Sequence, residues 1–186
     1  MKSKSQGRPV KGTSSLSKTT ILEEALIILD TEGITALSYR SLAKNMEVTP
    51  MALTNHIGTK NDLLKSLVEL VYFGINDSPL PSQPKEGIRF LLTDYCQRVL
   101  EHPNLTRLLL TDHSLMNTSL IQFTNLITQK VQSLVNNSSQ SKIVSDLIID
   151  YTHGFALSAT AQKDQSLPSL TVNDFTKGLD WILVKL

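Results

Sequence analysis

The stretch "VTPMALTNHIGTKNDL", residues 48–63, gathers hydroxyl, amide and imidazole groups around a small apolar side. Leu53 recurs at helical spacing with Ile57, and both are assigned to the core. The amide of Asn55 can bond adenine bidentately, and the groups of Thr54 and His56 can bond base edges or phosphates. This pattern suits recognition by hydrogen bonding.

The remaining candidates for chemistry do not form a pattern typical of an enzyme. The single cysteine, Cys96, lies at an apolar helical position, which favours a buried core thiol and excludes an intramolecular disulfide. His102, His113 and His153 lack the spacing of metal ligands. The sequence contains neither a Gly-rich phosphate loop nor a nucleophile elbow. We therefore expect no catalytic site, no metal and no cofactor.

Capping signals divide the first 75 residues into four helices. The second and third are too short to be stable alone, so they must pack on the first and fourth. This arrangement predicts a helix-turn-helix unit, in which the second of the paired helices lies in the DNA major groove. The expected N-caps are Ser17, Ser38, Thr49 and Thr59, with Gly33 ending the first helix, Pro50 in the first turn of the third and Asp62 completing an approximate capping box.

Helical periodicity continues to the end of the chain after a break at "NDSPLPSQP", residues 76–84. No period-two strand and no internal repeat is found, so the fold class is all-α with about nine helices. The next-to-last helix is expected to bury the pairs Ile143/Val144 and Leu147/Ile148, followed by Tyr151 and Phe155. The expected organisation is a basic arm over 1–16, a helix-turn-helix domain over 17–63 and a second helical domain over 64–186, with a helix over 60–75 linking the two domains.

Charge is distributed unevenly along the sequence. Residues 1–60 carry eight basic and five acidic side chains, a net charge of +3, whereas the remainder has a net charge of −2. The first 20 residues contain five basic groups and no acidic one. A basic front on an acidic body indicates an anionic partner for the front, although a solvated tail would have the same composition. Arg8 lies in a Gly-Arg-Pro triplet, a pattern typical of minor-groove hooks.

The segment "ILEEALIILDTEGITALSYRSLAKNMEVTPMALTNHIGTKNDLLKSL" resembles the DNA-binding domain of the TetR family of bacterial transcription regulators. The resemblance covers about 50 residues, and "HPNLTRLLL" and "FTKGLDWIL" extend it loosely into the C-terminal half. It departs from the family pattern at three positions. Thr54 stands where the family usually has Tyr, Ile57 where it has Phe, and Glu47 where a Gly commonly ends the second helix.

The resemblance implies which side chains face DNA. Lys60 lies at a helix N-terminus, where its charge and the free N–H groups would form a phosphate site together. Two alternatives stay open, because His56 could bond across the turn and Met51 could pack against the arm. The implied DNA-contacting residues are Arg40, Thr49, Pro50, Met51, Thr54, Asn55, His56 and Lys60, with Arg8 of the arm.

The C-terminal half mixes aromatic and polar residues with aliphatic ones, as pockets between helices do. Ordinary core packing would account for the same residues. The last two helices are apolar on one face and could form a four-helix interface between two copies. The expected ligand pocket comprises Phe90, Tyr95, Asn117, Phe123 and Tyr151. The expected dimer interface comprises Ile148, Phe155, Phe175, Leu179, Trp181 and Ile182.

These observations lead to the hypothesis of a homodimeric repressor that binds a palindromic double-stranded DNA operator and responds to a small, largely apolar effector. No signal peptide or membrane span is apparent, so a cytoplasmic location without membrane contact is expected. The alternative is a coactivator of the same fold that acts through a protein partner. The loss of the aromatic at Thr54 favours this alternative, whereas His56, Lys60 and the basic arm favour DNA.

Overall fold

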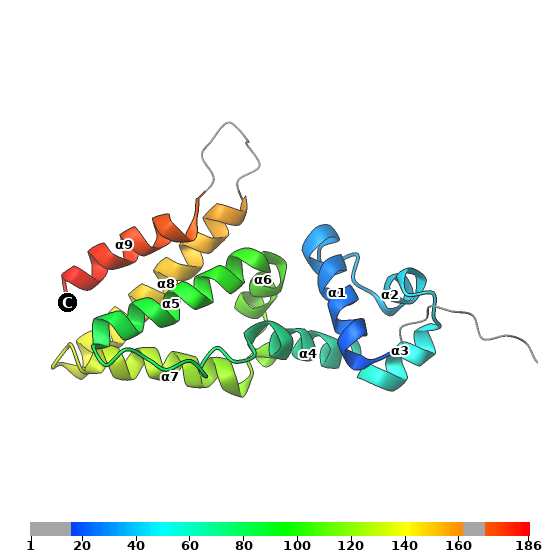
Figure 1. Ribbon diagram of the computed structural model, residues 1–186, viewed down its shortest axis with the longest axis horizontal. Coiled ribbons are helices and arrows are strands. Elements are labelled where there is room, and N and C mark those ends of the chain that lie inside the picture. The colour runs from blue at the N-terminus through cyan, green and yellow to red at the C-terminus, as the bar shows by residue number, and fades with distance from the viewer. Residues whose placement is uncertain (1–15, 162–169) are drawn as a thin grey trace, which may run out of the picture.

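The computed structural model describes residues 16–161 and 170–186, and every regular element within them is helical (Figure 1). This confirms an all-α fold with about nine helices. Arg8 and most of the connector before the last helix lie outside the described residues. The elements are α1 (Lys18–Glu32), α2 (Tyr39–Asn45), α3 (Pro50–Ile57), α4 (Lys60–Tyr72), α5 (Pro84–Glu101), α6 (Pro103–Thr111), the short 3₁₀ helix η1 (His113–Leu115), α7 (Thr118–Gln132), α8 (Ser138–Ala161) and α9 (Val172–Val184).

The first four helices begin at the predicted caps. The side chains of Ser17, Ser38, Thr49 and Thr59 each accept a hydrogen bond from a backbone N–H of the first helical turn. These bonds satisfy donors that a helix start leaves without an intrahelical partner. Gly33 ends α1 with φ of 83°, as predicted. Local hydrogen bonding therefore sets where α2 and α3 start, although neither is long enough to be stable alone.

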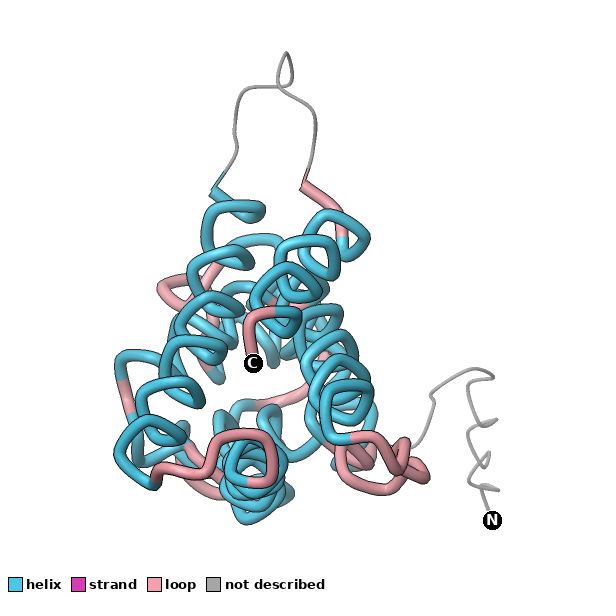
Figure 2. Tube along the Cα trace, turned by 90° about the vertical axis from the view of Figure 1, so that its left-hand side faces the viewer, coloured by secondary structure: helices cyan, strands magenta, loops and turns pink. Residues whose placement is uncertain are grey.

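The helices form two packed groups joined by α4 and α6. In Figure 1, α1, α2 and α3 lie at one end of the molecule, and α5, α7, α8 and α9 form a bundle at the other. Figure 2 shows this bundle nearly end-on. Within the bundle α5 packs against α7, α8 and α9, and α1 packs against both α4 and α6. Helices α4 and α6 thus contact both the N-terminal group of helices and the bundle.

Polar contacts tie α6 to α1. Nδ1 of His102 lies 2.7 Å from Oδ2 of Asp30, close to the last turn of α1. The amide of Asn104 donates to the backbone carbonyl of Leu29 at 2.8 Å. Leu29 and Asp30 belong to α1, whereas His102 directly precedes α6 and Asn104 lies in its first turn. A displacement of α6 therefore acts directly on the orientation of α1. We call these three side chains, Asp30, His102 and Asn104, the α1–α6 clamp.

Burial corrects part of the predicted face of α8 and α9. Ile143 and Leu147 were expected in the core but are 65% and 55% exposed. Three residues of the expected dimer interface, Ile148, Phe175 and Leu179, are fully buried within this chain and have no free surface for a second copy. Phe155 and Ile182 are half-buried and Trp181 is 68% exposed. The reason is that α8 and α9 are each apolar on two sides. Ile148, Phe175 and Leu179 lie on the sides that pack within the bundle, where α5 contacts both helices.

Glu47 occupies a strained backbone position just after α2. Its φ is 56°, and it is the one non-glycine residue with positive φ among the described residues. This left-handed conformation brings the Cβ of an L-residue close to its own carbonyl oxygen, at a cost of about 1–2 kcal/mol. The sequence comparison with the TetR pattern, where a Gly commonly stands here, identified this position correctly.

Replacing Glu47 by Gly is expected to stabilise the chain by about 1 kcal/mol, because the relieved strain exceeds the added freedom of glycine in the unfolded chain. The measurement is urea unfolding at fixed protein concentration. The control is Glu23→Gly, an exposed position inside the right-handed helix α1, where a loss of about 1 kcal/mol is expected. Equal losses in both variants would contradict the strain assigned to Glu47.

Candidate nucleic-acid interface

Helix α3 is held by one fully buried side chain and two partly buried ones, and it exposes its other side chains. Leu53 is 0% exposed, and Ile57 packs partly buried against the same core, which confirms their assignment. The other predicted residues in the described part of the chain are exposed on α2, on α3 with its N-cap and at the start of α4. The exposed predicted residues are Arg40, Thr49, Pro50, Met51, Thr54, Asn55, His56 and Lys60. We call them the α3 face.

The turn between α3 and α4 is fixed from both sides. The hydroxyl of Tyr39, at the start of α2, donates to the carbonyls of Gly58 and Thr59, each at 3.1 Å. Gly58 has φ of 98°, and a Cβ there would lie 2.7 Å from Oδ2 of Asp62. Glycine is therefore required at this turn. These contacts hold α3 and the start of α4 at a set angle, so the α3 face is pre-formed.

The capping box at the start of α4 uses part of the predicted phosphate site. The backbone N–H and the hydroxyl of Thr59 donate to Oδ2 of Asp62 at 2.8 and 2.7 Å, and the Asp62 N–H donates to the Thr59 hydroxyl. These hydrogen bonds from Thr59 lower the pKa of the Asp62 carboxyl. The N–H groups left for an anion are those of Lys60 and Asn61, beside the exposed Lys60 side chain.

Charge on the α3 face is positive and uncompensated. Residues 38–65 hold four basic and two acidic side chains, a net charge of +2. Every ion pair between described residues lies elsewhere in the chain. Arg40 and Lys60 therefore present full charges to solvent, as contacts to a phosphate backbone require.

The polar side chains of α3 differ in whether they already make hydrogen bonds within the chain. The Thr54 hydroxyl donates to the backbone carbonyls of Met51 at 3.0 Å and Pro50 at 3.3 Å, so its hydrogen is already used. Asn55 and His56 are exposed and make no side-chain hydrogen bond to another described residue, so the alternative of His56 bonding across the turn is not observed. Asn55 and His56 are the better hydrogen-bonding candidates.

Sequence reasoning missed two residues of this site. Lys44 is exposed one helical turn after Arg40, on the same helix α2. That i, i+4 spacing of two basic residues was a signal that could have found it. Tyr39 fixes the turn after α3 through hydrogen bonds to residues about 20 positions later. No local sequence pattern predicts such a contact.

The predicted ligand-pocket residues separate into different places. Tyr95 and Phe123 line a cavity of about 190 Å³ between α5, α6, α7 and α8. Asn117 is instead the N-cap of α7 and donates to Glu69 of α4 at 3.1 Å. Tyr151 donates to the carbonyl of Phe175 at 3.0 Å and packs between α8 and α9. These two residues serve the packing of helices and do not line that cavity.

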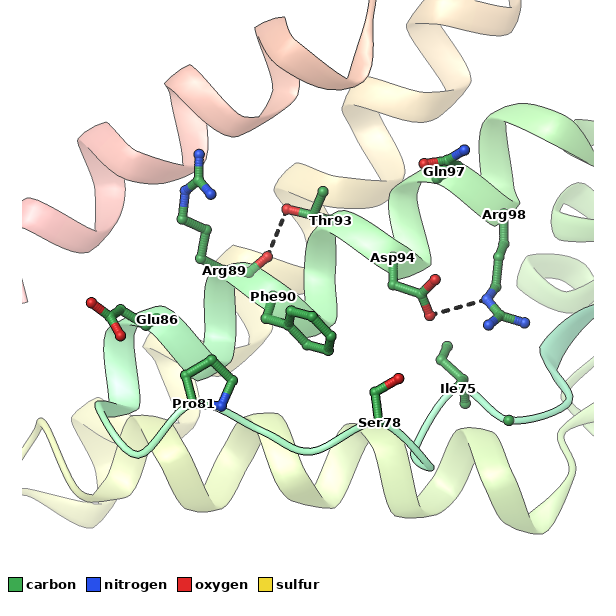
Figure 3. Close-up of a pocket in the computed structure, with 11 residues that line it drawn as sticks. Ile75, Ser78, Pro81, Glu86, Arg89, Phe90, Thr93, Asp94, Gln97 and Arg98 are labelled. Atoms are coloured by element: carbon green, nitrogen blue, oxygen red, sulfur yellow. Dashed lines mark hydrogen bonds and ion pairs between the residues drawn. The ribbon is translucent and has the colours of Figure 1, made fainter.

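Phe90 lines an open groove between α5 and the segment that leads into it (Figure 3). Figure 3 shows Phe90 among polar side chains of α5, with Ser78 and Pro81 on the facing segment. Arg98 in this groove donates to Asp94 and to the carbonyls of Val71 and Phe73. Its charge is used to anchor the end of α4, and the other arginine of the groove, Arg89, pairs with Asp180.

Other reactive groups are buried or dispersed. Cys96 is fully buried, which confirms the core thiol, and burial raises the pKa of the thiol to about 12. Among the described residues no three His, Cys, Asp or Glu side chains gather where they could hold a metal ion. Among the helices of that part of the chain, none combines the length and the apolar character needed to cross a membrane.

Solved structures share this arrangement over nearly the whole chain. BioQ from Mycobacterium smegmatis has a TM-score of 0.73 at 19% identity, covering 92% of this chain and 97% of its own. BioQ with its double-stranded DNA operator has a TM-score of 0.70 at 20% identity, with 92% and 98% covered. The TetR family protein ActR from Streptomyces coelicolor, in complex with (S)-DNPA, has a TM-score of 0.67 at 22% identity, with 92% and 97% covered. The chain has the TetR-family fold.

One curated relative resembles part of this chain in sequence. An HTH-type transcriptional regulator from Saccharopolyspora erythraea is 30% identical over 90 residues, which are 47% of this chain. The match spans 38% of the length of that relative. No family model matches the chain.

Proposed function

We propose that the chain is a DNA-binding transcriptional regulator that acts as a homodimer and represses from a palindromic operator. In this proposal residues 17–63 form the DNA-binding domain, residues 64–186 the effector and dimerisation domain, and α4 belongs to both. The observation that carries the proposal is the α3 face, an exposed, basic and unpaired surface on the second helix of a helix-turn-helix unit. The operator-bound structure of BioQ, which has the same fold, adds support.

A second copy is proposed to pack on α8 and α9. Apolar side chains are exposed on both helices, at Ile143 and Leu147 of α8 and at Trp181 and Val184 of α9. The two helices pack against each other, so their exposed sides form one surface. Two such surfaces would form a four-helix interface around a two-fold axis. Two recognition helices would then lie about 34–36 Å apart, one turn of DNA.

The dimer proposal predicts that Leu147→Ala weakens self-association at least about tenfold, because burying the exposed half of this side chain contributes about 0.8 kcal/mol or more and the dimer contains it twice. The measurement is analytical ultracentrifugation over a concentration series. The control is Glu23→Ala on α1, an exposed position on a helix whose packing partners are α2, α3, α4 and α6, which should leave the dissociation constant unchanged. A monomeric wild-type chain at all concentrations would exclude the proposed interface.

An effector is proposed to act through α6. Leu109 and Leu110 of α6 line the 190 Å³ cavity, and the α1–α6 clamp joins the start of the same helix to the DNA-binding helices. A molecule that shifts α6 therefore changes the orientation of α1, and a coupling of about 1–3 kcal/mol is sufficient for regulation.

The test of the function is selection of bound sequences from random double-stranded DNA, followed by affinity measurements at several salt concentrations. A regulator that neutralises phosphates should lose affinity steeply with salt, by about 0.9 in the logarithmic slope for each phosphate contact. Selection should return a palindrome if a dimer binds. Enrichment of no sequence, together with no salt-dependent binding to genomic fragments, would overturn DNA binding and favour the coactivator alternative.

A further inference from the structure

The cavity beside Tyr95 has the size of a single-ring molecule. Its volume is about 190 Å³, and it lies between α5, α6, α7 and α8 with His113 and the partly exposed Met116 at its rim. An apolar cavity of about 150 Å³ holds benzene. The additional volume leaves room for one ring with a small substituent and excludes a second fused ring.

The cavity wall offers an ion no carboxylate, lysine or arginine as a partner. None of its lining residues is Lys, Arg, Asp or Glu, and of its two histidines His113 lies at the exposed rim. Burial lowers the pKa of His153, against a smaller opposite effect of the Asp150 charge, and so favours the uncharged ring. An ionised group placed here would lose its hydration without gaining a counter-charge, which is strongly unfavourable. The ligand is therefore neutral.

One polar pair in the wall is available to a ligand. The hydroxyls of Thr124 and Thr152 donate to carbonyls of their own helices at 3.0 and 2.8 Å. The Tyr95 hydroxyl lies 2.8 Å from Nε2 of His153, and the direction of that bond depends on the tautomer of the ring. A ligand hydroxyl both donates and accepts, so it can join the pair in either direction.

The wall also offers aromatic faces. The rings of Tyr95 and Phe123 are stacked with centroids 5.2 Å apart, and Tyr72 continues the stack at 5.7 Å from Tyr95. A planar ring placed against Phe123 or Tyr95 makes the offset contacts that aromatic pairs prefer. Aliphatic side chains such as Leu92 and Leu120 complete the enclosure.

We infer that this cavity takes a neutral, single-ring, hydroxyl-bearing molecule of the phenol class, oriented by the Tyr95–His153 pair. The inference rests on the proposed function for its biological meaning, since the molecule would be the effector that shifts α6. It specifies that effector by size, charge and one polar group, all taken from the lining residues.

The test is an NMR titration of the full-length chain with four probes. Phenol should bind saturably, and toluene, which has the same shape without the hydroxyl, should bind about tenfold more weakly because one hydrogen bond is lost. Benzoate and 2-naphthol should bind at least tenfold more weakly than phenol, the first for its charge and the second for its size. Binding of benzoate or 2-naphthol as tight as that of phenol, or no saturable binding of phenol, would overturn the inference.

Two variants locate the binding. Tyr95→Phe removes one oxygen atom and should weaken phenol about tenfold while leaving toluene unchanged. Thr124→Trp replaces a small lining side chain by a large ring that occupies much of the cavity and should abolish binding of both, whereas Thr128→Trp, on the same helix outside the cavity wall, should preserve it. Phenol binding that survives Thr124→Trp would place the site elsewhere and overturn the inference. This second variant decides the question even if Tyr95→Phe does not fold.

DNA binding separates this inference from the proposed function. If the chain binds a selected operator but no phenol, the ligand class is wrong and the regulator proposal stands. If phenol binds the cavity and no DNA is bound under any salt condition, the proposed function is wrong and the ligand class stands. If both bind, phenol should weaken operator binding severalfold in the wild type and not in Thr124→Trp.

Discussion

Replacing Arg40 and Lys60 together by alanine is expected to weaken operator binding by at least about 100-fold. Both side chains are exposed on the α3 face and neither takes part in an ion pair between described residues. Each lost contact to a base or phosphate contributes about 1.4 kcal/mol or more, which is a factor of ten per residue. A dimer carries both substitutions twice, so the loss can only be larger.

The salt dependence gives the two residues different signatures. Lys60 at the start of α4 is assigned to phosphate, so Lys60→Ala alone should reduce the logarithmic salt slope of a dimer by about 1.8, twice the value of one phosphate contact. Arg40 can meet a base edge or a phosphate. If it contacts a base, Arg40→Ala should relax sequence preference at one operator position with little change in slope.

A matched control removes the same residue types elsewhere. Lys85 and Arg89 lie on α5, at the end of the bundle away from α3 (Figure 1). Lys85→Ala with Arg89→Ala changes the net charge equally and should leave operator affinity within about twofold, because the Arg89–Asp180 pair is exposed and contributes little. Unfolding curves should match the wild type for the α3-face variant. Unchanged affinity after Arg40→Ala and Lys60→Ala would contradict the residue assignment.

Thr54 bears on how tightly the α3 face can bind. Its hydroxyl donates into the helix backbone, and its side chain is much shorter than the tyrosine that the TetR pattern has at this position. One contact of the usual pattern is therefore missing from α3. The exposed Lys44 on α2 lies on the same side of the unit as Arg40 and offers a compensating charge.

Local hydrogen bonding made the N-terminal domain predictable. Ser17, Ser38, Thr49 and Thr59 each stand where the sequence pattern placed a cap. A cap and the donors that it satisfies lie within three residues, so the information is contained in a short segment. The exposure of the α3 face was predictable as well, because the burial of Leu53 is enough to fix which side of the helix faces the core.

The C-terminal half was less predictable because its helices contact several neighbours. α8 buries Ile148 and exposes Leu147, and helical spacing cannot tell which apolar side of such a helix faces the chain's own core. The cavity combines residues of α5, α6, α7 and α8 that are far apart in sequence. The partnership of Tyr95 with His153 spans 58 positions, and no motif in either segment signals it.

Gly178→Ala is expected to destabilise the chain by about 2 kcal/mol. A Cβ on Gly178 in α9 would overlap the hydroxyl of Tyr151 and lie 2.8 Å from its Cζ. The Tyr151 ring cannot move freely, because its hydroxyl donates to the carbonyl of Phe175 and its face stacks on the Phe175 ring at 5.4 Å. Overpacking of this kind costs about 1–3 kcal/mol, and the displaced hydroxyl loses a further hydrogen bond of about 1 kcal/mol. The better helix propensity of alanine offsets about 1 kcal/mol of this.

A double-mutant cycle separates the steric cost from other effects of alanine. In a Tyr151→Leu background the clash is absent, so Gly178→Ala should become neutral or stabilise by up to about 1 kcal/mol through helix propensity alone. The coupling between the two positions should therefore be about 2–3 kcal/mol, measured by urea unfolding of all four proteins at one concentration, since self-association would otherwise shift the midpoints. Equal destabilisation in both backgrounds would mean that Tyr151 is not what keeps residue 178 a glycine. Because α8 and α9 also carry the proposed dimer surface, a coupling of this size would mean that the close packing of Gly178 against Tyr151 sets the spacing of the two helices presented to a second copy.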